Sequence, residues 1–161
     1  MTEPLHAATP ATDAMTAIAL NTHVSRLITY FEALSPDSLH QLEAFYKPDA
    51  YFKDPFNEVR GVDQVRGIFS HMYTALHQPR FVVTERIAQD GQCFLSWNFE
   101  FYFRNFERNV LQTIRGGSHL KFTADGRVDF HRDYWDAAEE LYEKLPWVGG
   151  LMRWLKRRAS Q

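Results

Sequence analysis

The stretch FYKPDAYFKDPF, residues 45–56, predicts the end of a helix, a short loop and a strand. Side chains alternate between the two faces of a strand, so Ala50, Phe52 and Asp54 share one side and Tyr51 and Lys53 the other. Asp54 then ends an apolar strand face, where a carboxylate loses solvation and becomes a better base at neutral pH. Pairing stops at the proline that follows, which is typical of the mouth of a pocket, although Asp-Pro is also a common strand-ending turn.

The composition describes one soluble domain with a large apolar interior. The chain has 161 residues, of which 45% are hydrophobic and 24% charged, and its 13 phenylalanines raise the aromatic share to 15%. A net charge of −2 carries no signature of nucleic-acid binding. Cys93 is the single cysteine, so an intrachain disulfide is excluded. No apolar run reaches the length of a membrane-spanning helix, and the N-terminus lacks the pattern of a signal peptide, so we expect a cytoplasmic protein.

The order of patterns along the chain predicts an α+β fold. A flexible arm over residues 1–20 precedes a first helix that begins near Asn21 or Thr22. Ser35-Pro36-Asp37 starts a second helix, and a third runs from Gly61 to Gln78-Pro79. Hairpins follow, with turns at Asp90-Gly91 and Asp125-Gly126 and a bulge or bend expected at Gly116-Gly117. We expect three helices on the concave face of a curved, mostly antiparallel sheet, a cone that encloses an apolar cavity.

Five short segments give the chain a resemblance to the NTF2-like superfamily, which includes ketosteroid isomerase, the SnoaL-type polyketide cyclases and scytalone dehydratase. The resemblance covers roughly residues 21–137, which we take as the NTF2-like domain, and residues 138–161 form a separate helical basic tail. The superfamily hosts many functions on one scaffold, so the resemblance specifies the fold better than the chemistry. The segments that carry it are Phe45-Tyr46, Asp49 to Phe56, Gly61-Val62-Asp63, Asp125 to Val128 and Asp133-Tyr134-Trp135.

The resemblance implies a set of catalytic residues. Asp54 matches the catalytic base of ketosteroid isomerase, and Tyr30, 24 residues earlier, is close to the spacing of that family's hydroxyl donor. The position of the family's neutral carboxylic acid falls on Ser118, a departure that puts steroid isomerisation itself in doubt. Tyr30 and Ser118 would then hold the developing enolate oxygen.

The last strand offers a second acid–base pair. Asp129, His131, Asp133 and Trp135 alternate onto one side, and the family places the tryptophan in its cavity. His131 with Asp133 would make a general base and its orienting partner. The alternative is that these groups face solvent or a partner subunit while the intervening apolar residues face the core, and a bulge would reverse the facing. The expected substrate pocket is lined by Phe52, Trp97, Phe99, Phe101, Leu120 and Trp135.

Metal and cofactor chemistry finds no support in the sequence. The seven histidines are scattered and none has the paired spacing of a zinc helix. A phosphate-binding glycine loop and a nucleophile elbow are also lacking. We therefore expect neither a metal nor a cofactor.

The sequence leaves several functions open. The first is a cofactor-independent isomerase or cyclase that transfers a proton next to a carbonyl on a hydrophobic substrate. The second is a non-catalytic binding module for an apolar ligand. The basic, Trp- and Leu-containing tail could attach the protein weakly to the inner membrane surface or pack on its own cone or a partner. We also expect a homodimer through the outer face of the sheet, and no nucleic-acid partner.

Overall fold

The structure, a computed structural model, describes residues 16–105 and 107–140. It confirms the α+β class: two helices, a β-hairpin and a third helix precede a run of antiparallel strands. The second helix is a 3₁₀ helix, which we label η1. The elements in chain order are α1 (Ala17–Glu32), η1 (Pro36–Ala44), β1 (Tyr46–Lys53), β2 (Glu58–Arg60), α2 (Val62–Ala75), β3 (Leu76–Gln89), β4 (Gln92–Phe103), β5 (Gln112–Phe122), β6 (Val128–Tyr134) and the short α3 (Ala137–Glu140).

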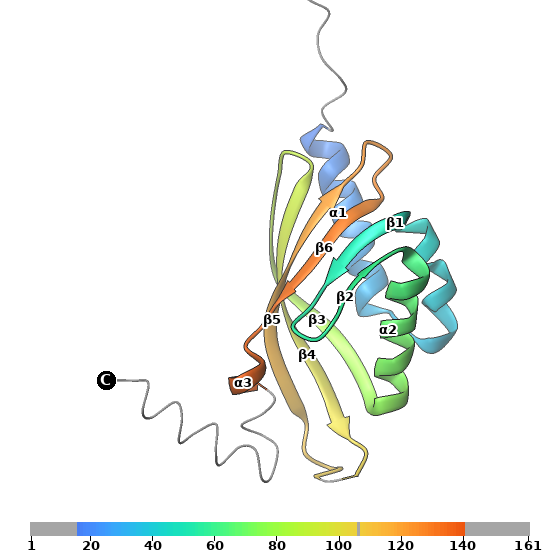
Figure 1. The fold of residues 1–161 in the computed structure, drawn as a ribbon. Helices are drawn as coiled ribbons and strands as arrows, with labels where there is room; N and C mark the ends of the chain where they lie inside the picture. The colour runs from blue at the N-terminus through green and yellow to red at the C-terminus, as the bar shows by residue number, and fades with distance from the viewer. Residues whose placement is uncertain (1–15, 106, 141–161) are drawn as a thin grey trace, which may run out of the picture.

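The six strands form one curved sheet in the order β2-β1-β6-β5-β4-β3. β1 and β6 are parallel, and every other neighbouring pair is antiparallel. α1, η1 and α2 lie along one side of this sheet (Figure 1). The core lies between the helices and the sheet, as expected for a cone.

β1 follows the predicted alternation. Ala50 and Phe52 are fully buried, while Tyr51 and Lys53 are only half-buried. The strand begins at Tyr46, without the expected loop, because its first residue already pairs with Val128 of β6. Further along the same parallel pairing, Phe52 lies beside His131. β1 therefore places the Phe52 ring beside His131, which lines the pocket described below.

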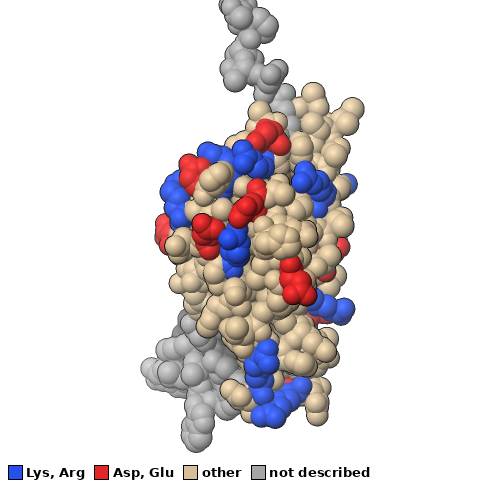
Figure 2. Space-filling model, turned by 90° about the vertical axis from the view of Figure 1, so that its right-hand side faces the viewer, with Lys and Arg blue, Asp and Glu red and all other residues tan. Residues whose placement is uncertain are grey.

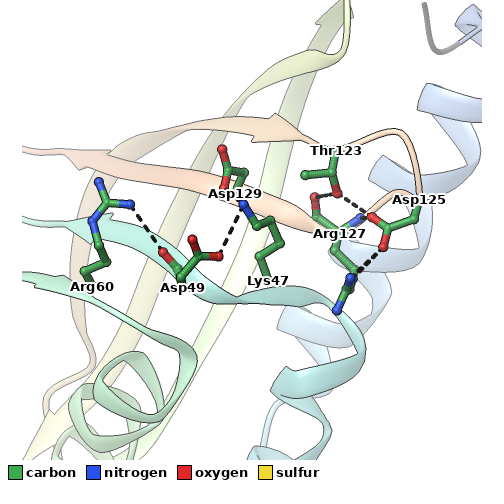
Figure 3. Close-up of polar contacts among 7 residues, drawn as sticks. All are labelled: Lys47, Asp49, Arg60, Thr123, Asp125, Arg127 and Asp129. Atoms are coloured by element: carbon green, nitrogen blue, oxygen red, sulfur yellow. Dashed lines mark hydrogen bonds and ion pairs between the residues drawn. The ribbon is translucent and has the colours of Figure 1, made fainter. Parts of the chain in front are cut away.

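A network of exposed ion pairs spans β1 and β6 (Figure 3). Lys47 Nζ lies 3.2 Å from an Asp49 carboxylate oxygen and 2.9 Å from Asp129 Oδ1 on β6. Arg127 and Asp125 form a second pair at 2.7 Å in the β5–β6 turn. Exposed ion pairs contribute about 0–1 kcal/mol each, so the network supports the strand pairing without dominating stability.

Two local expectations are corrected. α1 begins at Ala17, with Thr16 as its cap, and not near Asn21, because the apolar stripe already starts at the buried Leu20. Gly116-Gly117 makes no bulge: β5 pairs with β4 without a register shift there. The irregularity lies one strand further, opposite Lys121 and Phe122 on the β5–β6 ladder.

The outer surface of the helical side carries interspersed acidic and basic side chains (Figure 2). Within the described residues, no helix has the length and hydropathy needed to cross a membrane. Most of the expected basic tail, residues 141–161, lies outside the described residues.

Candidate functional site

A small pocket is enclosed between α1, α2 and the sheet. Its cavity volume is about 20 Å³, roughly the space needed by one water molecule. One end is apolar and the other end carries three polar side chains, those of Ser118, His131 and Asp133. The apolar lining comes from both helices and two strands: Phe31, Phe69, Phe81, Val83, Leu95 and Trp97.

The irregularity at the start of β6 decides which side chains face this pocket. Val128 and His131 are both buried although they are three positions apart, and the register shift on the β5–β6 ladder falls between Val128 and Phe130. An extra residue in one strand reverses the facing of everything beyond it. After Val128, the inward positions are therefore His131 and Asp133, as the second acid–base hypothesis requires.

The polar end is a continuous chain of hydrogen bonds across three strands and the start of β1. Trp97 Nε1 donates to Ser118 Oγ at 2.8 Å, and Ser118 Oγ donates to Asp133 Oδ1 at 2.5 Å. His131 Nε2 lies 2.7 Å from the same carboxylate oxygen. Its other ring nitrogen, Nδ1, lies 2.6 Å from the hydroxyl of Tyr46. One oxygen of Asp133, Oδ1, thus has two hydrogen-bond partners.

The buried Tyr46 hydroxyl determines where the imidazole proton sits. Burial, followed by the nearby Asp133 charge, raises the pKa of Tyr46 well above its ordinary value, so the hydroxyl keeps its proton. In the described part of the chain its only hydrogen-bond partner is His131 Nδ1, so Tyr46 must donate there. Nδ1 then accepts, and Nε2 carries the proton that is donated to Asp133.

The carboxylate of Asp133 keeps one oxygen open. No donor among the described residues reaches Oδ2, whereas Oδ1 is held by Ser118 and His131. The side chain is 15% exposed and also lines an outer groove beside Trp135. Asp133 is therefore oriented at the wall between the enclosed pocket and the exterior.

We expect Tyr46→Phe to destabilise the protein by about 1–3 kcal/mol, because it leaves a buried imidazole nitrogen without its donor. Urea unfolding measures this change, and long-range proton–nitrogen NMR measures the proton position on His131. Tyr51→Phe is the matched control, since that hydroxyl bonds the exposed Glu58, and its cost should stay below about 1 kcal/mol. A wild-type imidazole protonated at Nδ1 would contradict the assignment.

Asp54 does not reach this pocket. Its Oδ1 accepts the backbone N–H groups of Phe56 at 2.7 Å and Asn57 at 2.6 Å, and the Asn57 amide bonds both carboxylate oxygens. The carboxylate thus closes the turn after β1, because the strand ends at Lys53 before Asp54 can continue its buried face. Asp54 and Trp135 line the outer groove together.

The two expected enolate donors are occupied by protein acceptors. The Tyr30 hydroxyl donates to the Ser38 carbonyl at 3.1 Å, and its ring stacks on Phe45, away from the enclosed pocket. Burial raises the pKa of Tyr30 to about 12, which keeps it a donor in that bond. Ser118 does line the pocket, but its single proton goes to Asp133. The structure therefore does not bring Asp54, Tyr30 and Ser118 together around one cavity.

Of the expected pocket walls, Trp97 lines the enclosed cavity. Phe52 lies just behind it, edge-on to the His131 ring with 4.8 Å between ring centroids. Trp135 packs instead on Phe56 at the outer groove. The other three expected residues, Phe99, Phe101 and Leu120, are buried core residues that do not line it.

The lack of a side chain at Gly116 leaves space for the indole of Trp97, which lines the pocket. A Cβ atom added at Gly116 would lie 2.4 Å from Trp97 Cη2, closer than real side-chain contacts. The indole therefore lies flat across β5, where its N–H reaches Ser118. The glycine pair that sequence alone predicts to be a bulge has a packing role.

We expect Gly116→Ala to displace the indole, break its bond to Ser118 and cost about 1–3 kcal/mol through overpacking. Trp97 fluorescence and thermal unfolding measure both effects. Gly67→Ala is the control: its added methyl meets no atom within 4 Å, and it lies in α2, where alanine stabilises by about 0.5–1 kcal/mol. Equal behaviour of the two variants would refute the packing role.

Sequence reasoning missed Tyr46 and most of the apolar wall. Tyr46 looks like one more apolar residue at a helix end, and only its contact with His131, 85 positions away, reveals its role. Phe31 and Phe69 fit the helical stripes that any core would show. Among the described residues, no group of three or more His, Cys, Asp or Glu side chains is placed to hold a metal ion.

The family of the chain follows from this fold and a sequence match. Residues 27–131 match the family described as the SnoaL-like domain. This is more than half of the chain, so the protein belongs to that family, which confirms the NTF2-like resemblance. Comparison with curated proteins finds no match.

Solved structures of low sequence identity share the fold. A hypothetical protein of ketosteroid isomerase-like fold from Catenulispora acidiphila, solved in complex with trimethylamine, has a TM-score of 0.63 at 9% identity, covering 74% of this chain and 88% of that one. An NTF2-like protein of unknown function from Burkholderia pseudomallei has 0.63 at 19%, covering 74% and 92%. A LEH-like epoxide hydrolase from M. tuberculosis has 0.59 at 14%, covering 86% and 92%. At these identities the likeness shows the fold alone.

Proposed function

We propose that the protein is a small-molecule enzyme that transfers a proton on a carbon next to a carbonyl, with Asp133 as the base. The observation that carries the proposal is the state of this carboxylate. Asp133 is the charged residue among those lining the enclosed pocket, one of its oxygens is held by Ser118 and His131, and Oδ2 is open.

The proposed step needs only these groups. The substrate C–H bond breaks, its proton forms an O–H bond with Asp133 Oδ2, and the electron pair passes into an enolate. In a conjugated enolate, return of the proton to the far carbon gives an isomer. Attack of the enolate carbon on a second carbonyl carbon gives a ring, and the new alkoxide takes the proton back from Asp133. Ser118 and His131 orient the carboxylate, and an oriented base contributes about 10²- to 10⁴-fold.

The aromatic walls favour an apolar carbonyl compound as substrate. The empty cavity is small, so a substrate larger than a water molecule must displace side chains at its edge. Phe81 and Val83, which are only half-buried, are the lining residues best placed to move. Side-chain rearrangement of this kind is common on binding.

Deuterium exchange tests the proposal without knowledge of the natural substrate. A panel of cyclic ketones and β-keto esters is incubated with the protein in D₂O, and loss of the α-proton signals is followed by NMR. We expect catalysed exchange in at least one apolar member. Exchange at the buffer rate across the whole panel would refute the proposal.

A second candidate function is a non-catalytic binding module for an apolar ligand. It is favoured by one observation: the Trp97 N–H, the Ser118 hydroxyl and the His131 N–H all donate to protein acceptors. No polar hydrogen of these three residues is left to stabilise an enolate oxygen. An enzyme would have to break one of these bonds during the reaction.

We further propose that the protein is a homodimer through the outer face of the sheet. Ile87, Phe94 and Tyr134 are 72%, 43% and 46% exposed and line one shallow groove there. Apolar side chains gathered in this way are typical of interaction surfaces. We expect a dimer by light scattering at micromolar concentration and a monomer for Ile87→Asp. A monomeric wild type would refute the proposal.

A further inference from the structure

We infer that the ligand of the enclosed pocket carries a small ammonium group, which binds against Asp133. Of the nine residues that line the pocket, Asp133 is the acidic one and none is lysine or arginine. The carboxylate contacts two neighbours, Ser118 and His131, of which the first is always neutral.

The second neighbour, His131, is best paired when its Nδ1 accepts a hydrogen bond. A charged imidazole would place protons on both nitrogens, and the Tyr46 hydroxyl would then face an N–H instead of an acceptor. The buried hydroxyl has no other partner in the described part of the chain. With Nδ1 as acceptor and the Nε2 N–H as donor, every side-chain polar group of this hydrogen-bond chain is paired, and no lysine or arginine among the lining residues faces the Asp133 carboxylate. A buried charge of this kind is stabilised by a cation that it can bind.

The pocket walls suit a cation as well. Phe31, Phe69, Phe81 and Trp97 surround the cavity with aromatic rings. The faces of such rings carry partial negative charge and attract ammonium groups, most strongly where water is excluded. Aromatic walls with one carboxylate and neither lysine nor arginine are complementary to an organic cation.

The outer groove that shares Asp133 adds to the acidic field. It is lined by Asp54, Asp133 and Asp136 and by two basic residues, Lys53 and Arg132. Lys53 is also paired with Glu58, and the guanidinium of Arg132 lies over the Tyr134 ring, so the acidic residues of the groove outnumber the basic ones by one. An excess of acidic over basic side chains at a cleft favours the approach of positively charged ligands.

The size of the cavity restricts the group that enters. An ammonium nitrogen occupies about the volume of a water molecule, which the cavity of about 20 Å³ accepts without rearrangement. Its alkyl substituent would lie against Phe81 and Val83, the half-buried residues at the pocket edge. The ligand class is thus a short primary alkylammonium compound.

The inference rests on the proposed function only in using the same pocket. It concerns binding, and it stands whether or not Asp133 removes a proton. Cation binding without deuterium exchange would leave the inference intact and refute the enzyme. Exchange of neutral ketones without cation binding would do the reverse.

The experiment compares two probes of equal size and different charge. Butylammonium and butan-1-ol are titrated separately into the full-length protein at pH 7 and constant ionic strength. The indole N–H signal of Trp97, identified through its loss in Trp97→Phe, reports on the pocket by NMR. We expect butylammonium to bind at least about tenfold more tightly than the alcohol, as a desolvated cation–π contact and one ion pair together provide.

Two variants complete the test. Asp133→Asn should reduce the preference for the ammonium probe to near unity. Asp129→Asn is the matched control, because it removes an exposed carboxylate of the same strand that faces Lys47, and it should keep the full preference. Equal binding of the two probes by the wild-type protein, or no binding of either at 50-fold the concentration of the protein, would overturn the inference. Because the wild-type comparison needs no variant, a folding defect in Asp133→Asn does not affect this outcome.

Discussion

Asp133→Asn is expected to lower the rate of α-proton exchange by about 10²- to 10⁴-fold while the protein stays folded. Asparagine keeps the size of the side chain and can still accept the Ser118 hydroxyl, but it cannot take up a proton from carbon. NMR measures the exchange rate, and circular dichroism checks the fold. Among single substitutions at the pocket, this one should have the largest effect on activity, since it removes the proposed base itself.

Two further variants make the result specific. Asp129→Asn, on the outer side of the same strand, should change the rate by less than about threefold, because an exposed ion pair has little energetic weight. Asp54→Asn tests the residue that the sequence alone favours as base. A large loss of rate in Asp54→Asn, with Asp133→Asn unaffected, would return the role to Asp54 and contradict the proposal.

Phe52→Ala should have the largest effect on stability, about 3–5 kcal/mol. The ring is 1% exposed near the end of β1 and packs edge-on against His131 and Phe69. Its removal leaves a cavity between the sheet and α2 that the neighbouring elements cannot fill. For a chain of 161 residues, this loss corresponds to a fall in Tm of about 6–20 °C.

Lys53→Ala is the matched control for Phe52→Ala. The lysine is the next residue of the same strand, faces the other side of the sheet and pairs with the exposed Glu58. Its loss should cost less than about 1 kcal/mol. Thermal unfolding of both variants checks the facing of β1, and a comparable loss in the two would contradict it.

The elements of this fold were largely predictable because their signals are local. In β4, alternate residues from Leu95 to Phe103 are apolar, and the structure buries each of them. Ser35-Pro36-Asp37 does begin a helix, although its 3₁₀ geometry carries no signal in the side-chain pattern. The residues that form an apolar stripe or a turn are close together in the chain. Their pattern is therefore visible in the sequence itself.

The site was only half predictable. His131 and Asp133 were named as a pair because two residues two positions apart in a strand share a face. Whether that face was inside depended on a single extra residue near Val128, and the sequence carries no marker for it. Asp54 was misplaced for a related reason: the strand ends one residue before it, and its carboxylate closes the turn.

The sequence by itself determined the α+β fold, the buried faces of its strands and the family of the protein. Hydrophobic periodicity and the residue types that form turns depend only on positions that are close together in the chain. The tertiary structure decided which polar groups meet. Tyr46 reaches His131, and Trp97 reaches Ser118, across 85 and 21 positions of chain. Such contacts depend on strand order, register and one bulge, and each of these follows from the packing of the whole sheet.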